Sequence, residues 1–245
     1  MAAAGFDGFG LHYSDIPDAK RRYGWAGIRS LFQDSGIADI ELEGIPRWWS
    51  DDLESRYVRH RVLRAAEVLG ACHIKVTPDD LDEPWDKRMW QTRFAKLAAE
   101  AAGVGARLGL EFLPWSNIKN LRDGLDFVDG AGHDNGGVVL DIWHLERSQT
   151  PVDAILKLQR NRITSVELTD APGDVVGSMH EDTVNRRLYC GEGSFNIAGF
   201  INALRAIQWD GPWGIEIMSA DHRKTPLREA LRSAYVAGYS QLASC

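Results

Sequence analysis

The sequence predicts an α/β fold of the (β/α)8 TIM-barrel type, in which parallel strands alternate with helices. Three observations predict it. The chain has 245 residues, and roughly 250 is the usual size of such a barrel. Short apolar runs alternate with amphipathic stretches, and the runs are apolar enough to be covered on both sides. Acidic residues lie toward the ends of several runs, where parallel α/β folds build their sites.

Seven apolar runs have the length of buried strands. They recur at intervals that leave room for a helix between neighbours. The expected strands cover residues 9–13, 37–43, 71–76, 108–113, 137–142, 163–169 and 213–219.

Six stretches between these runs carry apolar residues at helical spacing. Thr150 and Thr225 each place a capping hydroxyl before a proline, whose fixed φ suits the first helical position. Gly70 stands where one of the helices should end. The expected helices cover residues 51–69, 85–106, 121–131, 151–159, 197–207 and 226–242.

The count is one strand short of a closed eight-stranded barrel. The opening Ala2-Ala3-Ala4-Gly5 reads like the end of a helix that leads directly into a strand. We therefore expect the first strand and most of the first helix to be lacking at the N-terminus. Unpaired strand edges associate readily, so we expect the gap to be covered, and a second subunit in a homo-oligomer is one way to cover it.

Composition limits the possible partners. With 28 basic and 35 acidic residues the net charge is −7, which argues against nucleic acid, whose binding proteins carry a basic patch. No apolar run reaches the roughly 20 residues that span a bilayer, and the start lacks the features of a signal peptide.

Cys72, Cys190 and Cys245 form no CxxC pair and are interpreted as free thiols. No GxGxxG motif supports a dinucleotide-binding fold. We expect one cytoplasmic domain over residues 1–245.

Four carboxylates recur at the ends of successive predicted strands. Burying an ionised carboxylate in an apolar strand is costly unless something pairs with it. Four at the same place in four strands suggest a shared cation. They are Glu111, Asp141, Glu167 and Glu216.

Five motifs together resemble the xylose isomerase-like TIM barrels, a family of sugar phosphate isomerases and epimerases in the superfamily of the AP endonuclease 2 proteins. The similarity runs from about Gly5 to Ser219. The motifs are Glu111-Phe-Leu-Pro-Trp115, Asp141-Ile-Trp-His144, Val166-Glu-Leu-Thr-Asp170, Arg187-Leu-Tyr-Cys-Gly-Glu-Gly193 and Gly214-Ile-Glu216.

The resemblance implies that the four carboxylates hold one divalent cation, commonly Mn²⁺, Mg²⁺, Co²⁺ or Zn²⁺. At the third position many members carry His and some Gln, whereas this chain has Glu167. Ligation by oxygen alone favours Mg²⁺ or Mn²⁺ over Zn²⁺. Four negative charges around a doubly positive ion leave open whether one carboxylate is protonated or faces a cationic side chain. Asp170, beside Glu167, is an alternative functional residue if Glu167 forms a salt bridge.

The resemblance also implies proton transfer next to a carbonyl, through an enediolate that a bound cation stabilises. Glu111 and Glu216 would then be both metal ligands and the catalytic base and acid. His144 and Arg187 match positions that contact substrate.

Further substrate contacts are expected from residues at strand ends and in entry loops. His73 and Lys75 lie near the end of one predicted strand. Glu43, or Glu41 on the same face of its strand, could bind a hydroxyl. Aromatic walls suit sugar or cyclitol faces, and Trp115 is our candidate for one; Trp48, Trp49 and Trp143 lie in similar loops, where some must be plain packing. Structural alternatives stay open: His144 could instead orient Asp141 through a hydrogen bond, Arg187 could pair with surface acids, and His73 and Lys75 could have a capping or core role.

Three kinds of function remain. The first is a metal-dependent isomerase or epimerase of a small sugar, cyclitol or hydroxy-carbonyl compound. The second is a dehydratase, a lyase that removes water from a keto-cyclitol or a dehydroshikimate-like substrate. A non-catalytic binding protein is the third, if the missing strand has removed activity. A DNA-repair endonuclease of the same superfamily is disfavoured, because it would need about three metals and several additional histidines at the strand ends.

Overall fold

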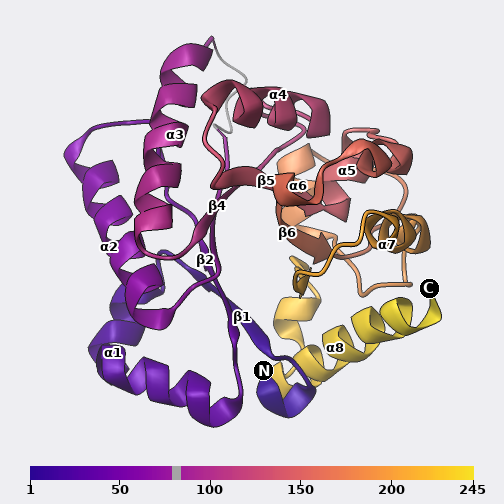
Figure 1. Ribbon diagram of the computed structural model, residues 1–245. Coiled ribbons are helices and arrows are strands. Elements are labelled where there is room, and N and C mark those ends of the chain that lie inside the picture. Colours follow the sequence, from indigo (N-terminus) through magenta and orange to yellow (C-terminus); the bar gives the residue numbers. More distant parts are fainter. Residues whose placement is uncertain (79–83) are drawn as a thin grey trace.

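Seven parallel strands curve into a nearly closed barrel in the computed structural model, which describes residues 1–78 and 84–245 (Figure 1). The strands follow one another around the sheet in chain order, each paired in parallel with the next. This confirms the predicted fold class. The strands are β1 (Gly8–His12), β2 (Asp39–Glu43), β3 (His73–Val76), β4 (Arg107–Glu111), β5 (Gly136–Asp141), β6 (Ile163–Leu168) and β7 (Trp213–Ile215).

The helices form the outer layer of the molecule (Figure 1). Three of them start at a side-chain cap, where Asp52, Asp86 and Asn120 each accept a hydrogen bond from a backbone N–H of the first turn. The α-helices are α1 (Ile16–Ser35), α2 (Leu53–Leu69), α3 (Lys87–Gly103), α4 (Leu121–Ala131), α5 (Ile142–Arg147), α6 (Met179–Asn185), α7 (Ile197–Ala206) and α8 (Leu227–Ser244). Short 3₁₀ helices are η1 (Ala2–Ala4), η2 (Val152–Lys157), η3 (Arg160–Arg162) and η4 (His222–Lys224).

The α-helix expected over residues 151–159 is wrong, because this segment forms the 3₁₀ helix η2. The hydroxyl of Thr150 hydrogen-bonds that of Ser148 at 2.8 Å and does not cap the segment. Thr225 likewise bonds the carbonyl of Asp221 and does not cap α8, although α8 forms as expected.

The helix α8 lies beside the N-terminus, against η1 and β7 (Figure 1). Gly5 ends η1 at φ 112° and lies against the ring of Tyr235, leaving no room for a side chain. The ring of Phe6 meets that of Tyr235 edge-on at 5.2 Å. Within residues 1–78 and 84–245, β1 and β7 are not paired with each other, and α8 lies over this opening from outside. Whether a strand is missing there, and whether a second subunit contributes, remain predictions.

The apolar core lies between the strands and the surrounding helices. Its largest aromatic cluster is built around Trp48, which is fully buried and donates to the carbonyl of Thr77 at 2.7 Å. Trp49 stacks on Trp90 at 3.9 Å between ring centroids. Trp48 and Trp49 therefore pack beside α3 and do not wall a substrate.

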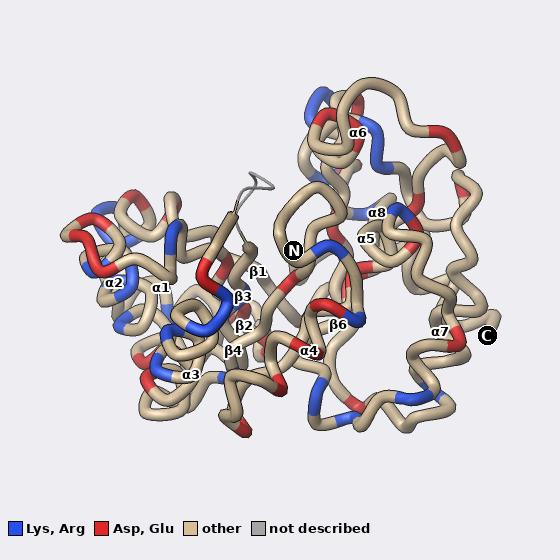
Figure 2. The backbone as a smooth tube through the Cα atoms, turned by 90° about the horizontal axis from the view of Figure 1, so that it is seen from above, with Lys and Arg blue, Asp and Glu red and all other residues tan. Residues whose placement is uncertain are grey.

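Charge on the outer layer is mixed. Lys, Arg, Asp and Glu are interspersed along α1 and α2 (Figure 2), as expected for solvated helix faces. No helix in the described part of the chain has both the length and the apolar character needed to cross a bilayer. The cytoplasmic location stays a prediction.

Candidate metal and catalytic site

The register of the sheet brings charged side chains to common levels inside the barrel. Asp141 of β5 lies opposite Glu167 of β6. Glu43 of β2 lies opposite Lys75 of β3, and Glu41 lies opposite His73. Alternate residues of a strand share a face, so two levels of charged groups are stacked along β2 and β3.

All four predicted metal ligands come together. One carboxylate oxygen from each of Glu111, Asp141, Glu167 and Glu216 lies within 4.8 Å of the others. Glu111, Asp141 and Glu167 are at most 5% exposed. Among the described residues, Glu111 Oε1 and Glu167 Oε2 have no hydrogen-bond donor. A buried carboxylate oxygen without a donor is costly, and a divalent cation is a partner that oxygen atoms of this kind accept. The donor set therefore fits the predicted cofactor.

Lys75 lies among these carboxylates and is only 1% exposed. Its Nζ is 2.8 Å from Glu167 Oε1, 3.2 Å from Glu216 Oε1 and 3.7 Å from Glu111 Oε2. Glu43 and Glu41 are also within 4 Å, at 3.4 and 3.8 Å. Burial lowers the pKa of Lys75, but the attraction of Glu111, Glu167 and Glu216 outweighs it and raises that pKa well above its ordinary value. Lys75 is therefore a fixed positive charge in the cluster.

Arg187 is the second buried cation of the site and has no exposed surface. Its Nη1 lies 2.7 Å from Asp141 Oδ2 and 2.9 Å from Glu216 Oε2. The other edge of the guanidinium donates to Thr183 Oγ1 at 2.9 and 3.1 Å. Burial lowers the pKa of Arg187, but Asp141 and Glu216 raise it above its ordinary value. The predicted substrate contact of Arg187 stays a prediction, and in this structure the side chain holds two predicted metal ligands.

The segment that carries Arg187 is held in place by a buried carboxylate that the sequence did not single out. Asp182 of α6 accepts from Arg147 at 2.8 and 3.0 Å and from Arg186 at 2.9 Å. A capping box between Ser178 and Glu181 starts α6. That box is visible in the sequence and could have located the helix, but nothing local pairs Asp182 with Arg147.

His144 and Trp115 lie at one side of the carboxylates. His144 Nε2 is 3.6 Å from both Glu111 Oε1 and Asp141 Oδ2, too far for a hydrogen bond. Within the described residues His144 Nδ1 has no partner. Burial, with the charge of Arg187, lowers the pKa of His144 well below its ordinary value, so the imidazole is neutral. The half-buried ring of Trp115 is 5.7 Å from that of His144. The predicted contacts of His144 and Trp115 with substrate stay predictions.

His73 lies at the level of Glu41, two residues before Lys75 along β3, and pairs with Glu41 through Nε2. Burial lowers the pKa of His73, but the charge and hydrogen bond of Glu41, together with the thiol of Cys72, raise it to about 9. Its Nδ1 is 3.2 Å from Cys72 Sγ. His73 thus pairs with Glu41 inside the barrel and lines the cavity described below, and its predicted contact with substrate stays a prediction.

The protein's own charges separate the pKa values of the two predicted catalytic carboxylates. Burial raises the pKa of Glu111, Lys75 lowers it, and the negative charges of Glu216 and Asp141 raise it again, so that it lies at about 8. Burial also acts on Glu216, but Lys75 and Arg187 lower its pKa to about 2. One group is thus kept protonated near neutral pH and the other ionised, a difference that suits an acid and a base.

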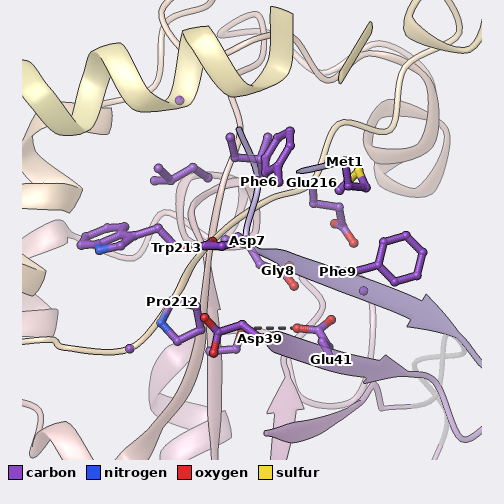
Figure 3. Close-up of a pocket in the computed structure, with 18 of the residues that line it drawn as sticks. Met1, Phe6, Asp7, Gly8, Phe9, Asp39, Glu41, Pro212, Trp213 and Glu216 are labelled. Carbon is purple, nitrogen blue, oxygen red and sulfur yellow. Dashed lines mark hydrogen bonds between the residues drawn. The ribbon is translucent and has the colours of Figure 1, made fainter. Parts of the chain in front are cut away.

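A cavity of about 500 Å³ opens between β1, β7 and α8 (Figure 3). Lys75, Glu167 and Glu216 line it, together with apolar residues that include Phe6 and Trp213. The opening between the edge strands thus leads to the carboxylate cluster.

Comparison with known proteins identifies the fold family. The model of the xylose isomerase-like TIM barrel family matches residues 1–235. The chain belongs to this family. The resemblance predicted from the five motifs is confirmed.

Relatives of this family member are enzymes. A 3-dehydroshikimate dehydratase of Pseudomonas putida is 27% identical over 94% of this chain, and the chain spans only 36% of that protein's length. An inosose isomerase of Bacillus velezensis is 21% identical over 94% of this chain and 85% of its own length.

Solved structures show the same fold. A crystal structure of the IOLI protein with a binding zinc atom has a TM-score of 0.88 at 17% identity, covering 99% of this chain and 90% of that one. A D-psicose 3-epimerase solved in the presence of D-fructose has a TM-score of 0.72 at 20% identity, covering 98% and 91%.

Asp170, the alternative to Glu167 in this family member, has its carboxylate fully engaged by backbone. It accepts from the N–H groups of Ala171 and Phe195 on one oxygen and of Gly191 and Gly193 on the other, at 2.9 to 3.0 Å. Asp170 therefore holds the loop over residues 191–193 in place, whereas Glu167 is one of the four clustered carboxylates. The pairing of Glu167 with Lys75 shows that facing the carboxylates and forming a salt bridge are not exclusive.

Proposed function

We propose that this protein is a divalent-metal-dependent isomerase or epimerase of a small sugar, cyclitol or related hydroxy-carbonyl compound. The observation that carries the proposal is the meeting of Glu111, Asp141, Glu167 and Glu216, with two of their buried oxygens lacking donors within the described residues. The activities of the relatives, isomerase and dehydratase, agree with chemistry at a carbon next to a carbonyl.

The four carboxylates would hold the cation, and Mn²⁺ or Mg²⁺ suits an all-oxygen set better than Zn²⁺ does. When bound, such an ion polarises the carbonyl and hydroxyl oxygens of a substrate and makes the adjacent C–H more acidic. Zn²⁺ remains an option, because one structural neighbour has a zinc atom.

Glu216 and Glu111 would move the proton. Glu216, which lies beside Lys75 and Arg187, removes the proton from carbon, and Glu111 returns one from the other side. His144, neutral and with Nδ1 free of partners among the described residues, orients a substrate hydroxyl. Trp115 supplies an apolar wall.

The second candidate is a dehydratase on the same site. The observation that favours it is the identity of 27% and 28% to two 3-dehydroshikimate dehydratases, over 94% and 93% of this chain. Elimination begins with the same proton removal as isomerisation. The two reactions differ in the next step, in which dehydration expels a hydroxide and isomerisation returns a proton.

Incubation in D₂O with Mn²⁺ and three candidate substrates, an inosose, D-psicose and 3-dehydroshikimate, tests both. Deuterium uptake with a new stereoisomer supports isomerisation, and loss of water to a conjugated enone supports dehydration. Glu216→Gln should abolish either reaction by removing the base. Glu192→Gln, on the exposed loop nearby, is the matched control and should leave the rate unchanged. Full activity of folded Glu216→Gln would refute the assignment.

A further inference from the structure

We infer that Lys75 and Arg187 set the net charge of the carboxylate cluster so that it selects a divalent ion over a trivalent one. This inference rests on the proposed function, because it concerns the ion which that function requires. It gives a role to two buried cations that stand among the proposed ligands.

Each of the four carboxylates lies close to one of the two cations. Lys75 Nζ is within 4 Å of Glu111, Glu167 and Glu216. Arg187 Nη1 reaches Asp141 and also Glu216, at 2.7 and 2.9 Å. Both cations are at most 1% exposed, so solvent screens them little.

The charges then balance. In the ion-bound state all four carboxylates are ionised, because carboxylate ligands bind without their protons. The four carboxylates and the two cations in contact then leave two negative charges, which a divalent ion neutralises. The nearby charges change this little, because Glu41 is paired with His73 and Glu43 is 35% exposed. This answers the question that the sequence raised about four negative charges around a doubly positive ion.

The cations also determine which oxygens stay available. Lys75 takes Glu167 Oε1, and Glu167 Oε2 is one of the buried oxygens with no donor among the described residues. On Glu111, Oε2 faces Lys75 and Oε1 is the oxygen without a donor. Each pairing thus leaves one oxygen of the carboxylate free to bind an ion.

Lys75→Met tests the inference through metal binding. Titration calorimetry of the full chain with Mn²⁺ and with Tb³⁺ gives two dissociation constants for each variant. Removing one positive charge should tighten both, and Coulomb energy scales with ion charge, so a tenfold gain for Mn²⁺ should accompany about a thirtyfold gain for Tb³⁺. Lys96→Met makes the same substitution on α3, where the side chain is 56% exposed, and should change neither constant.

Two further variants keep the test decisive if Lys75→Met folds poorly. Lys75→Met/Glu167→Gln removes one charge of each sign and should return the Tb³⁺ to Mn²⁺ affinity ratio to that of the wild type. Glu167→Gln alone leaves Lys75 with its other carboxylates and should lower that ratio. Circular dichroism checks that each variant is folded.

The outcomes separate this inference from the proposed function. If the wild type binds Mn²⁺ but folded Lys75→Met and Glu167→Gln keep the wild-type affinity ratio, the charge-setting role is overturned and the metal site stands. If the wild type binds neither ion, the proposed function fails and this inference fails with it.

Discussion

Asp170→Asn should be among the most destabilising single-atom changes in the chain. The carboxylate accepts four backbone N–H bonds, two on each oxygen. An asparagine keeps one oxygen and places an NH₂ donor where the other oxygen accepted two bonds. Those two bonds are therefore lost, and donor faces donor.

The magnitude follows from the two lost bonds. A hydrogen bond to a charged group contributes about 1.5–3 kcal/mol, so the free energy of unfolding should fall by about 3–6 kcal/mol. A domain of this kind is stable by only about 5–15 kcal/mol. The loop over residues 191–193 is packed so closely that any side chain at Gly193 would collide with the carbonyl of Ala171. It therefore has no room to shift and replace the two lost hydrogen bonds.

Urea denaturation followed by circular dichroism measures the effect, because a stability change moves the midpoint at constant slope. Asp174→Asn is the matched control. Its carboxylate is 74% exposed and lies 3.7 Å from Arg186, so its loss should change stability by less than about 1 kcal/mol. A midpoint for Asp170→Asn equal to that of the wild type would refute the structural role of this carboxylate.

Three further predictions concern the buried groups around the site. Arg187→Met should lower the free energy of unfolding by about 3–5 kcal/mol, because it leaves the buried carboxylate of Asp141 without its cation. Arg160→Met, whose exposed ion pair with Asp210 contributes little, should lower it by no more than about 1 kcal/mol, and equal urea midpoints for the two variants would count against the buried pairing. His73 has its folded pKa raised to about 9 from an unfolded value near 6.5, so its pairing stabilises fully below about pH 6.5 and is lost as pH rises through 9. His73→Gln should therefore show a smaller loss of stability between pH 6 and 9.5 than the wild type, and parallel pH profiles would show that the pairing is absent. Trp48→Ala should cost about 3–5 kcal/mol as a core truncation while leaving Mn²⁺ affinity unchanged, and a lost metal affinity in the folded variant would show that the aromatic cluster supports the site.

The strands could be predicted because each lies in a short run that is rich in apolar residues or, as in β2, alternates apolar with polar ones. The helix α1 could not, since only Ile16 and Ile28 of its residues are buried and Gly24 interrupts its helical geometry. The start of α5 was hidden for another reason. Asp141 ends β5 and also caps α5, so the apolar residue after it reads as a continuation of the strand.

The site was predictable to the extent that strand ends of a parallel sheet meet at one place. Four carboxylates at such ends had to converge if the barrel formed. The partners of Lys75 could not be predicted, because Glu167 is 92 residues away in sequence and across the barrel. The same holds for Arg187 and Asp141, which are 46 residues apart. Their pairing depends on the closure of the whole sheet.

The central claim is that four carboxylates far apart in sequence hold one divalent ion. Thermal unfolding with increasing Mn²⁺, together with calorimetric stoichiometry, tests it most directly, because an ion that binds only the folded state raises the unfolding temperature with concentration. We predict about one Mn²⁺ per chain and a stabilisation that is lost in Asp141→Asn/Glu216→Gln, a double variant that removes two of the proposed ligands. A wild type that no divalent ion stabilises, or a double variant stabilised as strongly as the wild type, would contradict it.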